Sequence, residues 1–539
     1  MRTAGILLHP SSFPSSFGIG DLGPIAYRFL DWIAGAGISV WQVLPLGPVD
    51  GGGSPYCSPS AFAGNPLLIS PEQLLADGFI TVDDLEAHRL SPQWTAEPVD
   101  YPRVVERKRS LLEIAYGRFS AGEAGQWRDG YQQFIRNHAE WLEPYALFMA
   151  LADVHQNYDW TRWPVGSDLG RRLGRGEAVD TSSLGPEVER LAGVHRFGQF
   201  LFDLQWRQLR DHAHRLGIRI VGDMPMYVAH ASSDAWSHPD LFELNEAGVS
   251  TNVAGVPPDY FSATGQLWGN PLYNWAAMKE DGYAWWVSRI RNDLQRADVV
   301  RIDHFRGLEA YWSVPASAST AAEGEWRPGP GADLLSTLCQ AGLQSAEGSL
   351  FDGCALPLIA EDLGLITPEV LELRQQFGLP GMSVLQFAFA QVLPDDRCLP
   401  DAIPEDSVAY TGTHDNDTTL GWFRSDIQHV EHAVARLERY GSVDAETVSH
   451  QMIRFAWQSR ASLAVAPLQD VLGLGTEARM NIPGTASGNW QWRFPAELLT
   501  DSLRNWLATV TLETGRTISG PVSVATDPAT LCANHECTL

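Results

Sequence analysis

Residues 299–307 read VVRIDHFRG, a short apolar run that ends on a carboxylic acid. The run has the length of a strand buried on both faces, and a stretch with helical character, Ala284–Arg296, comes before it. The same succession of helical sequence and short apolar run recurs along the chain. It predicts parallel strands that alternate with helices.

Eight runs of this kind are found in the chain, and no internal repeat accompanies them. The expected strands are Gly5–His9, Ser39–Leu46, Ile218–Met224, Val299–Asp303, Leu356–Glu361, Met382–Phe387, Ser407–Thr413 and Leu463–Gln469. Eight buried strands that alternate with helices predict an α/β fold, the (β/α)8 TIM barrel.

The strands are unevenly spaced, so the barrel must carry insertions. We expect one catalytic barrel domain over residues 1–539, interrupted at approximately 47–217, 241–280 and 312–350. The first insertion is expected to be a largely helical subdomain, because Val104–Phe119 and Tyr131–Gln156 carry apolar residues at helical spacing. Phe197–Leu216 also has helical character. In the other two insertions, Leu241–Asn274 is expected to be a long loop and Ala318–Gly331 a flexible excursion after the fourth strand.

The composition excludes several classes of partner. The chain has 539 residues, 44% of them apolar, and a formal net charge of −27. A nucleic acid or an anionic membrane would need a basic face, so neither is an expected partner. No segment reaches the roughly 18 apolar residues of a membrane span, and no signal-peptide pattern follows the first methionine.

The cysteines predict a reduced, cytoplasmic protein. The chain has six, and their spacing shows no disulfide framework. Cys532, His535 and Cys537 crowd the C-terminal tail, which is a weak hint of a metal site; an ordinary tail is the favoured interpretation. No cofactor and no metal is expected.

Acidic residues end four of the expected strands. They are Asp223, Asp303, Glu361 and Asp415, and Arg301, His304, His414 and Asn416 lie beside them in sequence. The carboxyl ends of barrel strands surround the active site, so these acids should converge on one opening. Glycosidic bond cleavage needs one protonated carboxyl and one ionised carboxylate, and a group of neighbouring acids supplies both.

Each residue also has a structural interpretation. Asp303 could simply end a strand. Either Glu361 or Asp362 could be the reactive acid, because alternation turns only one of them inward. The combination around Asp415 also fits a metal site, and His304 could be a packed barrel histidine.

Taken together, these motifs resemble the 4-α-glucanotransferases known as amylomaltases or disproportionating enzymes, glycoside hydrolase family 77 of the α-amylase superfamily. The similar segments are HPSSFPSSFGIGDLG, WQVLPLGP, SPYCSPSAFAGNP, GDMPMYVAH, PPDYFSATGQLWGNPLYNW, RIDHFRG, AEDLG, GLPGM, THDN and EARMNIPGTASGNWQWR.

The resemblance implies catalytic roles. Asp303 matches the nucleophile, Glu361 the acid/base, and Asp415 the acid that grips the donor sugar and promotes its distortion. It also implies substrate contacts at Tyr56, Asp223, Tyr260, Phe261, Trp268, Arg301, His414 and Asn481. Among these, Tyr56 matches a ring stacked under the donor sugar, and Tyr260, Phe261 and Trp268 match the loop that covers the acceptor groove.

The implied reaction is retaining transfer of an α-1,4-glucan segment to the 4-hydroxyl of another sugar. Implied substrates are maltooligosaccharides and α-1,4-glucans derived from starch or glycogen. An α-amylase-like hydrolase is the alternative enzyme, and a non-catalytic glucan-binding barrel and a metal-dependent hydrolase are two further possibilities. The sequence departs from the family pattern at Cys57, Ala231 and Trp312–Ser313, which leaves the three catalytic positions untouched.

Overall fold

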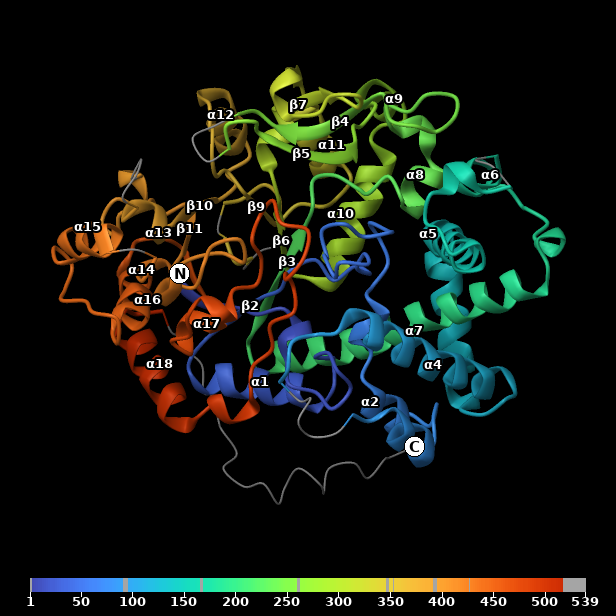
Figure 1. Ribbon diagram of the computed structural model, residues 1–539, viewed down its shortest axis with the longest axis horizontal. Helices are drawn as coiled ribbons and strands as arrows, with labels where there is room; N and C mark the ends of the chain where they lie inside the picture. The colour runs from blue at the N-terminus through green and yellow to red at the C-terminus, as the bar shows by residue number, and fades with distance from the viewer. Residues whose placement is uncertain are drawn as a thin grey trace.

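The computed structural model describes residues 2–90, 96–164, 168–258, 262–345, 349–351, 353–390, 395–425 and 427–516. Its centre is an eight-stranded parallel sheet in the order β10-β11-β12-β1-β2-β3-β6-β9 (Figure 1). A hydrogen bond from Ala360 N–H to the Pro380 carbonyl, 2.9 Å long, joins the two ends of this order. The sheet is therefore barrel-shaped.

The eight barrel strands confirm the eight that the sequence predicts. They are β1 (Thr3–Leu7), β2 (Val40–Gln42), β3 (Arg219–Met224), β6 (Val299–Ile302), β9 (Leu358–Ala360), β10 (Gly381–Val384), β11 (Ser407–Tyr410) and β12 (Leu463–Pro467). Nearly every strand residue is buried, as expected for strands covered on both faces. Most of the strands are shorter than the predicted apolar runs, because the last residues of most runs already form the loops of the site.

Helices follow or precede these strands along the chain. The helices of the barrel part are α1 (Pro24–Gly35), α10 (Ala284–Arg296), α11 (Gly331–Gln340), α12 (Pro368–Gln376), α13 (Leu385–Ala388), α14 (Thr419–Phe423), α15 (Ile427–Leu437), α16 (Val448–Gln458), α17 (Leu468–Val471) and α18 (Asp501–Glu513). The predicted helix Ala284–Arg296 has the bounds of α10. Among the described residues, no helix is both long and apolar enough to cross a membrane.

The first insertion is helical, as predicted, and lies to the right of the barrel in Figure 1. It contains α2 (Pro71–Ala76), α3 (Val82–His88), α4 (Tyr101–Ser120), α5 (Arg128–His155), α6 (Asp168–Gly174) and α7 (Pro186–Arg215). The stretch Phe197–Leu216 is the second half of the longer helix α7.

The prediction of a long loop over Leu241–Asn274 is wrong, because two strands lie within this range. β4 (Asn252–Val256) and β5 (Gln266–Pro271) join β7 (Ala310–Pro315) and β8 (Glu325–Pro328) in an antiparallel sheet, β5-β4-β7-β8. Part of the expected excursion Ala318–Gly331 is thus strand β8. The sheet lies above the barrel in Figure 1, next to the short helices α8 (Ser233–Ser237) and α9 (Trp275–Glu280).

Two buried glutamines on α7 hold the long loop that follows β2. The Gln199 Oε1 accepts from Gly64 N–H at 2.6 Å, and its Nε2 donates to the Gly64 carbonyl at 2.8 Å. Gln205 makes the same pair of bonds to Ser70, at 2.7 and 3.2 Å. Each amide therefore satisfies both backbone groups of one loop residue, as a paired strand would.

We predict that Gln199→Met lowers the free energy of unfolding by about 2–5 kcal/mol, because it leaves the buried Gly64 N–H and carbonyl without partners. Urea denaturation followed by tryptophan fluorescence measures the change. The control is Gln132→Met on α5, where the glutamine is exposed. Equal, small effects of the two substitutions would contradict a structural role for the Gln199 amide.

Candidate active site

The predicted site residues that the structure describes gather at the carboxyl ends of the barrel strands. A cleft of about 1000 Å³ opens there, and its walls include Tyr56, Trp268, Asp303, His414, Asp415 and Asn481. Backbone bonds from Asp303 N–H to the Met224 carbonyl (2.9 Å) and from Glu361 N–H to the Ile302 carbonyl (3.1 Å) extend the ladder of β3, β6 and β9. The two acids are thus held as rigidly as strand residues.

Arg301 forms a buried ion pair with two acids. Its Nη1 donates to both oxygens of Asp223, at 2.7 and 2.8 Å, and its Nη2 donates to Asp303 Oδ1 at 2.9 Å. Burial alone would lower the pKa of Arg301, but Asp223 and Asp303 raise it well above its ordinary value. The guanidinium therefore stays charged and fixes the direction of the Asp303 carboxylate.

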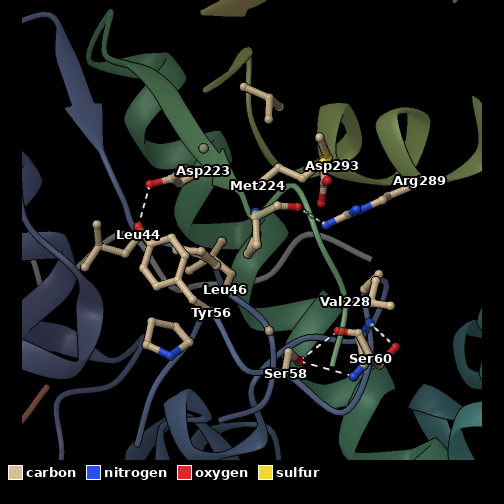
Figure 2. Close-up of a pocket in the computed structure, with 18 of the residues that line it drawn as sticks. Leu44, Leu46, Tyr56, Ser58, Ser60, Asp223, Met224, Val228, Arg289 and Asp293 are labelled. Atoms are coloured by element: carbon tan, nitrogen blue, oxygen red, sulfur yellow. Dashed lines mark hydrogen bonds between the residues drawn. The ribbon is translucent and has the colours of Figure 1, made fainter. Parts of the chain in front are cut away.

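Tyr56 links the cleft to this ion pair. Its hydroxyl donates to Asp223 Oδ2 at 2.8 Å, as Figure 2 shows, and its ring stacks on His414 at 5.0 Å. Behind the ring lies a cavity of about 60 Å³ whose walls include Leu44 and Asp293. The side chain of Asp223 has no exposed surface, so in this conformation it acts through Tyr56 and Arg301.

Glu361 lies beneath His304 and is not among the residues that line the open cleft. Its Oε2 accepts from His304 N–H at 2.7 Å and its Oε1 from Leu363 N–H at 2.9 Å. The pKa of Glu361 is raised to about 7, and burial is the largest cause. Arg301 opposes the rise, the charge of Asp303 adds to it, and the amides of Leu363 and His304 oppose it. The carboxyl can therefore gain or lose a proton near neutral pH.

The neighbouring acid, Asp362, points elsewhere. Its Oδ1 accepts from Met382 N–H at 2.7 Å, and its Oδ2 lies 3.4 Å from Arg374 Nε. The strand pleat thus separates the two acids, and only Glu361 is turned toward Asp303 and Arg301.

Asp415 is held by residues far along the chain. Asn481 Nδ2 donates to its Oδ1 at 2.6 Å, and Arg479 Nη2 donates to its backbone carbonyl at 2.6 Å. The His414 Nε2 lies 3.4 Å from the same Oδ1. Asn416 is turned away, because its Oδ1 accepts from Thr413 N–H at 2.9 Å and closes the turn.

The aromatic loop is described in part. Trp268, on β5, is 38% exposed and meets the ring of His304 edge-on at 4.8 Å. Tyr260 and Phe261 lie outside the described residues, as do Cys532, His535 and Cys537. Within the described ranges, no group of three or more His, Cys, Asp or Glu side chains could hold a metal ion.

Sequence reasoning missed several residues of the site. Trp490 packs against Tyr56 at 5.6 Å, Arg479 ties two loops together, and Tyr410 donates to Gln42 Oε1 at 2.9 Å beneath the site. His9 is buried beside His414, and burial lowers its pKa to about 3. Arg479 and Trp490 lie within the segment EARMNIPGTASGNWQWR, which marked the region but gave no roles.

The arrangement provides what acid-assisted displacement requires. Asp303 is held by a guanidinium and partly exposed to the cleft, and Glu361 is a partly buried carboxyl with a raised pKa. Two acids whose surroundings differ in this way can act as nucleophile and proton donor. Cys57, the departure nearest to the site, is exposed and also lines the cleft.

Comparisons with known proteins agree with this chemistry. A sequence model of the family described as 4-α-glucanotransferase matches residues 8–500. A 4-α-glucanotransferase of Synechocystis sp. is 44% identical over 523 residues, 96% of this chain and 98% of that protein. One from Thermus thermophilus is 46% identical over 503 residues, 92% and 96% of the two chains. The amylomaltase from Streptococcus agalactiae, solved in complex with acarbose, superposes with a TM-score of 0.87 at 33% identity, covering 96% of this chain and all of that one.

We predict that Asp303→Asn lowers the pKa of Glu361, because the substitution removes a negative charge that raises it and leaves Arg301 less neutralised. Infrared difference spectra recorded across pH 4–9 follow the protonated carboxyl, and Glu361→Gln identifies its band. An unchanged or raised pKa in the Asp303→Asn protein would show that the two carboxyls do not interact.

Proposed function

The chain belongs to the 4-α-glucanotransferase family, and on this premise we propose that Asp303 is its nucleophile, Glu361 its acid/base and Asp415 its donor-gripping acid. The activity of the chain is that of a 4-α-glucanotransferase. One observation carries the proposed roles. Asp303 is ion-paired and lines the cleft, and the partly buried Glu361, whose pKa is raised to about 7, interacts electrostatically with Asp303 and Arg301.

In the first step, Asp303 attacks the anomeric carbon of an α-1,4-linked glucose unit. The bond from that carbon to the leaving 4-oxygen breaks, and Glu361 transfers its proton to that oxygen. A covalent glucosyl ester on Asp303 remains. Arg301 holds the attacking carboxylate in place, and Asp415 and His414 face the sugar that is bound there.

In the second step, the ionised Glu361 removes the proton from the 4-hydroxyl of an incoming sugar. That oxygen attacks the anomeric carbon, the ester bond to Asp303 breaks, and the α-linkage forms again with net retention. A transferase has to place a sugar where a hydrolase admits water. Tyr260, Phe261 and Trp268 are the residues we propose for that task.

The proposed substrates are maltooligosaccharides and α-1,4-glucans derived from starch or glycogen. Support comes from the amylomaltase that was solved with acarbose. An uncharged glucan also suits a cleft that is lined by the aromatic rings of Tyr56 and Trp268. We propose Tyr56, Asp223, Arg301, His414 and Asn481 for the donor side, with Asp223 and Arg301 acting through Tyr56 and Asp303.

We further propose that the protein works in the cytoplasm. The four cysteines that the structure describes, Cys57, Cys339, Cys354 and Cys398, are free thiols, which suits a reducing compartment.

The proposal predicts that maltotriose alone, with EDTA present, is converted into a series of longer oligosaccharides plus glucose. The concentration of reducing ends should stay nearly constant. Transfer conserves the number of glycosidic bonds, and Asp303 as nucleophile and Glu361 as proton donor and acceptor need no metal. Chromatography of the products with a reducing-end assay measures both quantities. Rising reducing ends without longer products would identify a hydrolase, and activity lost on chelation would identify a metal-dependent enzyme.

We also predict that kcat/KM on maltotriose falls as pH rises through about 7, because the first step requires protonated Glu361 and the pKa of this group lies there. Glu361→Gln should lower kcat about 10²- to 10⁴-fold. It should also abolish the fall of kcat/KM above pH 7, which is the alkaline limb of the pH profile. The matched control is Asp362→Asn, the adjacent buried acid, which should keep the limb. A limb that survives in Glu361→Gln would assign the proton to another group.

A further inference from the structure

His304 has an uncommon backbone conformation. It follows Asp303 directly and adopts φ = +54°, in the left-handed region that few residues other than glycine adopt, with asparagine, aspartate and histidine the most frequent of these. In this conformation its N–H donates to Glu361 Oε2 at 2.7 Å, as the backbone turns away from β6 toward the end of β9. A strained backbone is retained where its surroundings determine it, so the contacts of His304 carry the argument.

We propose that His304 is a positioning residue whose left-handed backbone aims its N–H at the acid/base carboxyl, and whose ring, packed against Trp268, holds that backbone in place. The inference rests on the proposed role of Glu361 and extends it to the acceptor side of the cleft. It assigns the function of His304 to its backbone amide, with its side chain as a support.

The surroundings of the imidazole favour packing over proton transfer. The ring meets Trp268 edge-on at 4.8 Å and lies 6.5 Å from the ring of Tyr227. Its Nε2 is buried and has no hydrogen-bond partner among the described residues. Burial also lowers the pKa of His304 to about 4, so the ring is neutral at working pH.

The His304 amide affects both the orientation and the protonation of the Glu361 carboxyl. The charged groups that face Glu361 are Arg301 and Asp303, and the amides that contact it are those of His304 and Leu363. A carboxylate with two N–H donors is fixed in rotation, and the donors favour its ionised form. Loss of the His304 bond should therefore raise the pKa of Glu361 and release one of its oxygens.

The contact with Trp268 connects the acid/base to the acceptor side. Trp268 belongs to β5 and lines the cleft, while its edge rests on the His304 ring. An acceptor sugar in contact with Trp268 would therefore push on the His304 ring. That ring supports the backbone whose N–H donates to Glu361. The proposal thus gives a physical route from acceptor binding to the group that must become a base in the second step.

Two substitutions at residue 304 separate backbone from side chain. Asparagine enters the left-handed region readily, so its own preference replaces the support of the ring, whereas the β-branched valine disfavours that region. We expect His304→Val to lower kcat for maltotriose disproportionation about 10- to 100-fold, with KM changed less than threefold, and to move the alkaline limb of kcat/KM to higher pH. His304→Asn should keep kcat within about fivefold of the wild type and leave the limb within about 0.3 pH units.

The outcomes distinguish the proposals. Equal losses in both variants, or a loss in His304→Val with an unmoved alkaline limb, would overturn the positioning role. Wild-type protein and Glu361→Gln are measured in parallel, because a limb that persists without Glu361 overturns the proposed function instead. Circular dichroism checks folding; if His304→Val does not fold, His304→Gly, which adopts φ = +54° without a ring, must match His304→Asn.

Discussion

The buried guanidinium of Arg301 is the interaction on which the rest of the site depends. It lies between Asp223 at the end of β3 and Asp303 after β6, so it joins two neighbouring strands where their loops begin. Removing one partner of such a pair leaves an uncompensated charge in the interior, which is far costlier than losing a surface ion pair. Arg301 orients Asp223, and Asp223 accepts the hydrogen bond from the Tyr56 hydroxyl. Arg301 and Asp303 also act in opposite directions on the pKa of Glu361.

Below this ion pair the barrel provides rigidity, and above it the insertions provide the walls. Gln199 and Gln205 attach the loop after β2 to α7, and that loop carries Tyr56 to the cleft. The antiparallel sheet brings Trp268 over His304, and the segment near Asn481 reaches Asp415. The opening thus combines side chains from parts of the chain that are far apart in sequence.

The sequence predicted all eight barrel strands, because a strand covered on both faces leaves an uninterrupted apolar run. The small antiparallel sheet was not predicted. Both β4 and β5 contain glycine, and β5 also contains proline. They form because β4 pairs with β5 on one side and with the distant β7 on the other, which no local pattern records. The strand ends located the acids, yet their surroundings were beyond sequence reasoning. The choice of Glu361 over Asp362 needed the resemblance, and the structure gives its physical reason in the contacts of Asp362 with Met382 and Arg374.

The pairing of β1 with β12 also has a consequence for biosynthesis. Thr3–Leu7 lies in register with Leu463–Pro467, while the other edge of β1 pairs with β2. The chain leaves the ribosome from its N-terminus, so β1 exposes one unpaired edge until β12, far along the chain, has been made. Unpaired strand edges promote aggregation, and contacts between distant residues form slowly. Closure of the barrel is therefore a late event in folding, and the nascent protein is vulnerable along the edge of β1 until then.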